Sequence, residues 1–126
     1  MFSGTHILLY SADADADRAF LRDVLGFRNV DAGHGWLIFA LPPAEMAVHP
    51  ADAKTAQPHA DSKMLGASVY LMCDDVNAMV HSLEANKVKC APLQKERWGI
   101  RTTITLPSGG EIGLYQPTHP TALDLK

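Results

Sequence analysis

The sequence predicts an α+β fold of two βαβββ modules, whose strands form one curled mixed sheet around a central cup. A strand-and-helix pattern opens the chain and starts again after residue 65, and each helix precedes three short apolar segments separated by turn residues. The two helices start at Asp13 and Asp75. The two helix starts are therefore 62 residues apart, and two positions in the closing strands, Ala47 and Gly113, are 66 residues apart, which is nearly the same separation. In each module the helix covers one face of the strands and leaves the other face uncovered. The uncovered faces of the two modules can curl together and line a cup.

The first module is expected to span residues 4–49 and to open with an apolar strand at 6–10. A helix follows, with capping and acidic residues at its start and Gly26 at its end. Its apolar stripe has helical spacing and consists of Phe20, Leu21, Val24 and Leu25. The module then continues in three short strands, expected at residues 27–32, 35–41 and 44–49.

The second module repeats this order over residues 65–117. The polar segment before it, 50–64, has no apolar period and is expected to be a linker or a long loop. Asp75 is placed to cap the second helix. The strands of this module are expected at residues 66–73, 88–93, 99–106 and 111–116. Residues 118–126 form a tail, and the chain of 126 residues is expected to be a single domain.

The composition is typical of a globular protein and excludes several classes of partner. Hydrophobic residues make up 47% and charged residues 20% of the chain. The formal net charge is −3 and there is no basic cluster, so nucleic acid is not an expected partner. No apolar run approaches the roughly 20 residues of a membrane helix, and the N-terminus lacks the pattern of a secretion signal, so a cytoplasmic protein with no membrane partner is expected. Cys73 and Cys90 are too few for a disulfide framework or a zinc motif.

Three stretches of the sequence carry a resemblance to a known family. They are THILLYSADADADRAFLRDVLGF (5–27), which runs from strand into helix, MCDDVNAM (72–79) at the second helix start, and RWGIRTTITLPSGGEIGLYQP (97–117), a closing hairpin. Together they resemble the vicinal oxygen chelate superfamily, which includes glyoxalase I, extradiol dioxygenases, fosfomycin-modifying enzymes and bleomycin-binding resistance proteins. The resemblance implies the cup, a small-molecule ligand within it and assembly as a homodimer.

In metal-dependent members of this family the cup holds a divalent ion, bound by His or Gln from the first strand and Glu from the last strand of each module. The resemblance places these four positions at His6, Ala47, Ser68 and Gly113. Alanine and glycine have no side-chain donor, and a serine hydroxyl is a poor ligand beside a carboxylate or an imidazole. Only His6 therefore remains of the usual quartet, and no cofactor is expected.

A displaced site for a divalent metal is the alternative interpretation. Glu45 and Glu111 lie two residues before the expected ligands and His49 lies two after, on the same strand face. A step of two residues moves a donor by roughly 6.5–7 Å, whereas metal–ligand bonds are about 2.0–2.2 Å long. Such a site therefore needs a changed register or a bulge.

The side chains expected to line the cup are His6, Trp36, His49, Ser68, Tyr70, Trp98, Arg101, Glu111 and Tyr115. The aromatic ones suit a planar or ring-bearing ligand, and they are equally well explained as core or dimer contacts. Arg101 could bind an anionic ligand through two parallel hydrogen bonds, and it is equally well explained as a solvated arginine on the surface. Glu111 suits general-base chemistry if it is buried, whereas its place beside a Gly-Gly turn also fits an exposed carboxylate.

Three functions remain open on the sequence alone, and no catalytic residue is assigned. The loss of ligand donors at Ala47, Ser68 and Gly113 favours a protein that binds a small organic molecule in a metal-free cup. One alternative is a divalent-metal-dependent lyase, transferase or extradiol dioxygenase with a non-standard site. The other is a metal-independent enzyme that moves protons with Glu111, His6 or Tyr70. A homodimer is expected because open sheet edges and a cup rim favour cover by a second chain.

Overall fold

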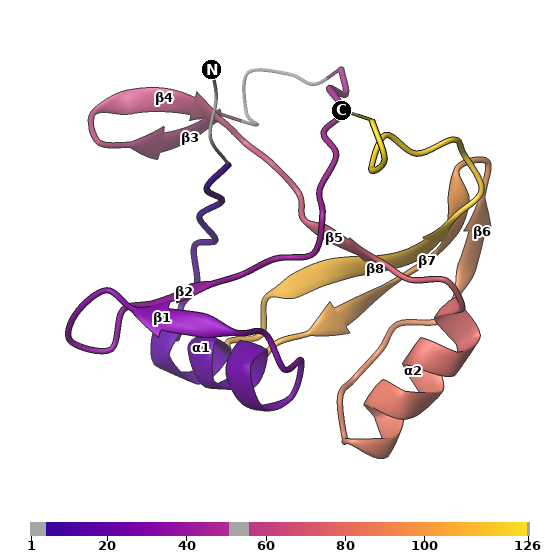
Figure 1. Cartoon of the computed structure of the whole chain (residues 1–126), viewed down its shortest axis with the longest axis horizontal. Helices are drawn as coiled ribbons and strands as arrows, with labels where there is room; N and C mark the ends of the chain where they lie inside the picture. The colour runs from indigo at the N-terminus through magenta and orange to yellow at the C-terminus, as the bar shows by residue number, and fades with distance from the viewer. Residues whose placement is uncertain (1–4, 51–55, 126) are drawn as a thin grey trace. The chain divides into compact units, whose positions relative to one another are not determined.

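The computed structural model describes residues 5–50 and 56–125 and belongs to the α+β class that the sequence predicts, but the described strands lie in three sheets rather than in the single curled sheet that was expected. The described part contains two helices and eight short strands in three sheets (Figure 1). These elements belong to two compact units, which we call the first and the second unit. The first comprises Met1–Ala40 and Thr105–Glu111, and the second comprises Leu41–Ile104 and Ile112–Lys126. No helix of the described residues is long and apolar enough to cross a membrane.

The first unit contains helix α1 (Ala14–Asp23) and the antiparallel strands β1 (Asn29–Asp31) and β2 (Leu37–Phe39). The Asp13 side chain caps α1 by accepting a hydrogen bond of 3.2 Å from the Ala16 amide. This bond satisfies one of the amides that a helix leaves free in its first turn. Phe20, from the predicted apolar stripe, is buried. The helix therefore forms where the capping and periodicity signals place it.

The second unit contains most of a four-stranded mixed sheet in the order β5-β8-β7-β6. Its elements are β5 (Tyr70–Met72), α2 (Val76–Ala85), β6 (Gln94–Glu96), β7 (Gly99–Thr105) and β8 (Glu111–Pro117). Strand β5 runs parallel to β8, and β6 runs antiparallel to β7. The core of this unit includes the sheet residues Ile104 and Leu114 and the helix residues Val76 and Leu83, all of which are buried.

Residues 50–64 were predicted to be a linker or a long loop; of these, 51–55 lie outside the described residues, and the rest contains a hairpin of β3 (Ala56–His59) and β4 (Ser62–Leu65) instead. Ala60 and Asp61 form its two-residue turn with positive φ angles of 47° and 62°. Two positive φ angles in succession are the mark of a type I′ turn, which Asn-Gly or Asp-Gly usually signals. The prediction was wrong here because this turn contains no glycine or asparagine.

Two other predicted strands are absent from the described residues, at 6–10 and at 44–49. Local composition favours extended chain in both places, but a strand exists only when a neighbouring strand completes its hydrogen-bond ladder. Prolines also flank 44–49 on both sides, and because proline has no backbone N–H, fewer amides there can donate to a neighbouring strand. The strand predicted at 88–93 is reduced to a single bridge between Cys90 and Ile104. The remaining predicted strands are present, most of them shorter than expected.

Candidate ligand-binding site

Three aromatic side chains gather on one face of the sheet in the second unit. Tyr70 of β5, Tyr115 of β8 and Trp98, which precedes β7, all meet edge-on. The ring centroids are 5.7 Å apart for Tyr70 and Trp98, 5.5 Å for Tyr70 and Tyr115, and 5.2 Å for Trp98 and Tyr115. This geometry is favourable because the positive edge of one ring meets the negative face of the next. We call these three residues the aromatic cluster.

The members of the aromatic cluster differ in exposure. Tyr115 is 8% exposed and forms the base of the cluster, whereas Tyr70 is 41% exposed. Trp98 is half-buried. The cluster therefore presents ring surface from Tyr70 and Trp98 to solvent.

Two glycines make room for the aromatic cluster. Tyr70 pairs with Gly113 in the register of β5 and β8, and its ring would overlap a Cβ atom at Gly113. A Cβ atom on Gly99 would lie 2.5 Å from the carbonyl oxygen of Gln116 and 2.9 Å from Cδ2 of Tyr115. Both positions therefore require glycine for the tyrosine rings to pack as they do.

His119 and Glu45 form the polar edge of the cluster. The imidazole of His119 stacks on the Tyr115 ring, with centroids 5.9 Å apart and planes inclined by 24°. Its Nε2 atom lies 3.0 Å from the Tyr115 hydroxyl and 4.0 Å from Oε2 of Glu45. The other oxygen of Glu45 accepts a hydrogen bond of 2.8 Å from the Ala122 amide. The carboxylate is thus held against the C-terminal segment.

The Tyr115 hydroxyl is a hydrogen-bonding group at the base of an apolar surface. Burial raises its pKa, and the neighbouring charge of Glu45 and the hydroxyl of Tyr70 raise it further. The phenol is therefore neutral at physiological pH, so it can donate one hydrogen bond and accept others.

The chain after β8 also anchors the loop that carries Trp98. The Thr118 amide donates a hydrogen bond of 3.0 Å to the carbonyl oxygen of Trp98. The Thr118 hydroxyl donates a second bond, of 3.1 Å, to the carbonyl oxygen of Arg97. Thr118 thus helps to position the indole ring against the two tyrosines.

Three other predicted site residues of the second unit, within its described part, make no hydrogen bond or ion pair to the aromatic cluster. The Arg101 guanidinium donates to Oε1 of Gln94 at 2.6 Å and lies 3.5 Å from Oε1 of Glu96. His49 is exposed and its Nδ1 atom lies 2.7 Å from a backbone carbonyl oxygen. Ser68 is exposed in the chain before β5. Arg101 is therefore engaged by its own hairpin.

The predicted site residues of the first unit are all on its surface. His6 and Glu111 are exposed. Trp36 is 52% exposed, and the guanidinium carbon of Arg18 lies 4.8 Å from the centroid of its ring. Trp36 thus makes a cation–π contact, which is a surface interaction of modest strength.

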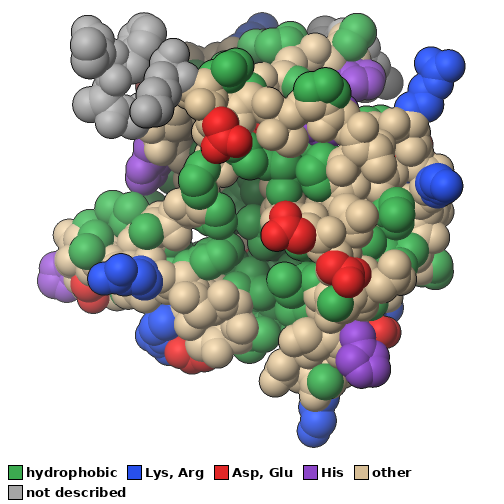
Figure 2. Space-filling model, turned by 45° about the vertical axis from the view of Figure 1, so that its right-hand side comes forward, with side chains coloured by type: hydrophobic (Ala, Val, Ile, Leu, Met, Phe, Trp, Pro, Cys, Tyr) green, Lys and Arg blue, Asp and Glu red, His purple; other side chains and the backbone are tan. Residues whose placement is uncertain are grey.

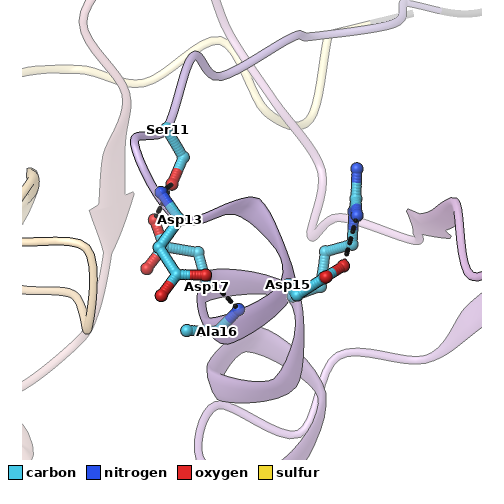
Figure 3. A network of polar contacts seen from close by, with 6 residues as sticks. Ser11, Asp13, Asp15, Ala16 and Asp17 are labelled. Atoms are coloured by element: carbon cyan, nitrogen blue, oxygen red, sulfur yellow. Dashed lines mark hydrogen bonds and ion pairs between the residues drawn. The ribbon is translucent and has the colours of Figure 1, made fainter.

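A buried carboxylate in the first unit was not anticipated from the sequence (Figure 3). Oδ2 of Asp17 accepts hydrogen bonds of 2.7 Å from the hydroxyls of Ser11 and Ser108, and Oδ1 accepts one of 3.0 Å from the Ser108 amide. Burial of the carboxyl acts to raise the pKa of Asp17, but these three bonds outweigh it and the pKa is lowered. This network fastens the turn at 107–110 to α1, so its role is structural.

The four positions of the usual metal quartet do not fit a metal ion. Ala47 and Gly113 have no donor, and the Tyr70 ring occupies the space next to Gly113. Within residues 5–50 and 56–125, no three His, Cys, Asp or Glu side chains come close enough together to hold a metal.

The sequence predicts Tyr70, Trp98 and Tyr115 among the residues that line a cup, but it does not predict the polar edge beside them. Glu45 was considered only as a displaced metal ligand, and His119 fell in the tail. The available signal was slight, since His119 follows Tyr115 by four residues, beyond the last expected strand. The contact depends on how the tail turns back, which no local pattern indicates.

The sequence matches the Glyoxalase/Bleomycin resistance protein/Dioxygenase superfamily over residues 5–114, so this chain belongs to that superfamily. The match confirms the resemblance found in the sequence. No curated protein matches the sequence significantly.

Solved structures of the same fold include binding proteins and enzymes. TnmS3, an antibiotic binding protein from Streptomyces sp. CB03234, is 22% identical, with a TM-score of 0.60 over 94% of this chain and 100% of its own. Lactoylglutathione lyase from Agrobacterium tumefaciens is 20% identical, with a TM-score of 0.60 over 90% and 92% of the two chains. A superfamily member from Sphaerobacter thermophilus DSM 20745 is 18% identical, with a TM-score of 0.60 over 91% and 98%. At these identities the likeness shows the fold alone.

Proposed function

We propose that this chain binds a small organic molecule, with a planar apolar part, on the aromatic cluster. The observation that carries the proposal is the cluster itself. Tyr70 and Trp98 offer ring surface to solvent next to Tyr115, whose hydroxyl meets the polar edge at His119. Apolar walls with a few placed polar groups are typical of sites for small molecules. The antibiotic-binding role given for TnmS3, which shares the fold, supports binding as the function.

The proposed site works without a metal cofactor. Two of the four ligand positions have no donor, and the packing of Tyr70 on Gly113 leaves no room for a longer side chain there. The test is elemental analysis of protein purified without an affinity tag or chelator, followed by titration with zinc, nickel and iron(II). We expect no stoichiometric metal. Near-stoichiometric metal that is lost in His6→Ala would instead support a metal-dependent enzyme.

We further propose that the modules 4–49 and 65–117 build a cup in a homodimer, with His6, Trp36, His49 and Ser68 lining the remainder of it. Hydrophobic side chains are visible at the surface in Figure 2. The exposed ones include Ile7, Leu9, Met46 and Val48, at 43%, 48%, 91% and 89%. Two of these lie in 6–10 and two in 44–49, the segments that contain no strand. A second copy of the chain would cover them and complete open edges. Light scattering after gel filtration at micromolar concentration tests this, and a monomer contradicts it.

The test of ligand binding is the rise in melting temperature with planar aromatic compounds. A ligand that binds only the folded state stabilises it by about 2.7 kcal/mol at a concentration of 100 times its Kd. We expect Tyr70→Ala to reduce the shift caused by any compound that stabilises the natural sequence. Val30→Ala, at a position 65% exposed in β1, is the matched control and should keep the full shift.

Two results would contradict this function. If no planar aromatic compound raises the melting temperature, the cluster is ordinary packing. If the shift is unchanged in Tyr70→Ala but lost in a variant of the first unit, such as Trp36→Ala, the ligand binds elsewhere.

A further inference from the structure

The imidazole of His119 stacks on one member of the aromatic cluster, Tyr115. The three rings of the cluster meet one another edge-on, at interplanar angles of 73–82°. His119 instead lies nearly parallel to the Tyr115 ring, at 24°. Offset stacking is one of the two favoured arrangements of aromatic rings, and it is open to a flat aromatic ligand.

The hydrogen bonds of His119 show which chemical groups suit this position. Its Nδ1 atom lies 2.7 Å from the carbonyl oxygen of Pro120, which can only accept, so Nδ1 carries a proton. When the ring is neutral, Nε2 is an acceptor, and the Tyr115 hydroxyl, 3.0 Å away, can donate to it. A ring nitrogen that accepts therefore suits the Tyr115 hydroxyl.

The carboxylate of Glu45 completes the surroundings of this ring. Its Oε2 atom is 4.0 Å from Nε2 of His119, and its Oε1 atom is bonded to the Ala122 amide. A carboxylate accepts hydrogen bonds and attracts positive charge. A ligand with an N–H group therefore finds an acceptor at the edge of the cluster.

The segment that carries His119 is lightly held. Among the described residues, the polar contacts that tie 119–125 to the rest of the unit are the bond from the Ala122 amide to Glu45 and those of His119; most of this segment is exposed, and Leu123 is half-buried. Leu125, near its end, is 79% exposed. Thr118, by contrast, is fixed to the loop of Trp98 by two hydrogen bonds. Opening after Thr118 would break the polar contacts of His119 and Ala122 and expose the half-buried Leu123, while the two bonds of Thr118 to the loop of Trp98 stay in place.

We propose that His119 is an internal occupant of the ligand site, and that the external ligand is a planar nitrogen heterocycle which takes its place on Tyr115. This inference rests on the proposed function. The ligand stacks on the Tyr115 ring and accepts the hydrogen bond of the Tyr115 hydroxyl through a ring nitrogen. Residues 119–125 give way when it binds, so the tail is an autoinhibitory strap.

The experiment compares benzimidazole with indole by isothermal titration calorimetry. The two molecules have the same size and an N–H group, but only benzimidazole has an accepting ring nitrogen. Each is titrated into the natural sequence, into His119→Ala and into His81→Ala, a control at an exposed histidine of α2. Tyr115→Phe in the His119→Ala background removes only the hydroxyl.

If the strap is open for about a tenth of the time, its removal strengthens binding about tenfold. We therefore expect His119→Ala to bind benzimidazole about tenfold more tightly than the natural sequence, and His81→Ala to match the natural sequence. Benzimidazole should be preferred over indole, and the preference should disappear when Tyr115→Phe is added.

The other outcomes overturn the inference in distinguishable ways. Weaker binding in His119→Ala means that His119 is a ligand contact rather than an occupant, and the proposed function stands. Equal binding of benzimidazole and indole in His119→Ala means that the Tyr115 hydroxyl selects nothing, and again the proposed function stands. If no variant binds benzimidazole, the inference is wrong, and the proposed function falls with it only if other planar aromatic compounds also fail to raise the melting temperature.

Discussion

The ring of Tyr70 lies directly over Gly113, in the space that any larger residue at position 113 would need for its Cβ atom. The two residues are register partners in β5 and β8, so their proximity follows from the parallel pairing of these strands. Position 113 is also where the family resemblance places a metal ligand. The aromatic cluster and a side-chain ligand at this position therefore exclude one another.

Gly113→Ala should destabilise the protein, because the new methyl group forces Tyr70 out of its place. Overpacking of this kind costs about 1–3 kcal/mol. The free energy of unfolding in urea measures the loss, and binding of an aromatic ligand should weaken as the cluster is displaced.

Two controls separate the clash with Tyr70 from any general cost of replacing a glycine in this hairpin. A Cβ atom on Gly110 would lie 3.4 Å from Oγ of Ser108, which is ordinary contact, so Gly110→Ala should have little effect. In a Tyr70→Ala background the clash partner is gone, and Gly113→Ala should cost much less than in the natural sequence. Equal costs in the two backgrounds would refute the explanation.

Asp17→Ala should destabilise the protein by about 1.5–3 kcal/mol at neutral pH, because it removes a buried carboxylate that accepts three hydrogen bonds. Asp15→Ala is the matched control on the same helix. The Asp15 carboxylate is 95% exposed and pairs with Arg18 at the surface, so its loss should have almost no effect. Urea unfolding of the two variants measures the difference.

The contribution of Asp17 should also depend on pH. Because the folded state lowers the pKa of this carboxyl, its stabilising effect is complete above the unfolded value near 3.8 and is lost as the pH falls through the folded value. The difference in unfolding free energy between the natural sequence and Asp17→Asn should therefore shrink on acidification from pH 6 to below about 3.8. A difference that stays constant would show that the charge of Asp17 does not contribute.

Asp75→Ala should weaken α2, since the Asp75 side chain accepts a hydrogen bond of 3.0 Å from the Ala78 amide at the helix start. Loss of such a cap costs about 1 kcal/mol. Asp74→Ala removes the same charge one residue earlier without touching the cap and is the matched control. Equal losses in the two variants would point to charge rather than capping.

The parts of the fold that sequence reasoning predicted correctly are those encoded locally. Asp13 and Asp75 cap the two helices as expected, because a cap and an amphipathic stripe need only nearby residues. The segment 6–10 has the apolar composition of a strand and forms none, because its ladder depends on a partner far along the chain. The hairpin turn at 60–61 was missed because Ala-Asp is not one of the residue pairs, such as Asn-Gly or Asp-Gly, that usually indicate two positive φ angles.

The candidate site divides in the same way. Tyr70 and Tyr115 were expected to line a pocket, and strand alternation together with register brings them to one face. His119 and its contact with Glu45 arise from the path of the tail, which has no periodic pattern. Asp17 was likewise missed because Ser108, its main partner, is 91 residues away in the sequence.

The Cys73 thiol should react slowly with iodoacetamide at mildly alkaline pH. Burial raises its pKa, and the nearby charges of Asp74 and Asp75 raise it further, so less of the reactive thiolate is present. Cys90→Ser isolates this thiol, and the rate of alkylation is followed by mass spectrometry as the pH is raised. We expect the rate to reach half its maximum at a higher pH in the folded protein than in the same variant unfolded in guanidinium chloride. Adding Asp74→Asn should move this midpoint back toward the unfolded value, whereas a midpoint that is the same folded and unfolded would mean that access alone limits the reaction.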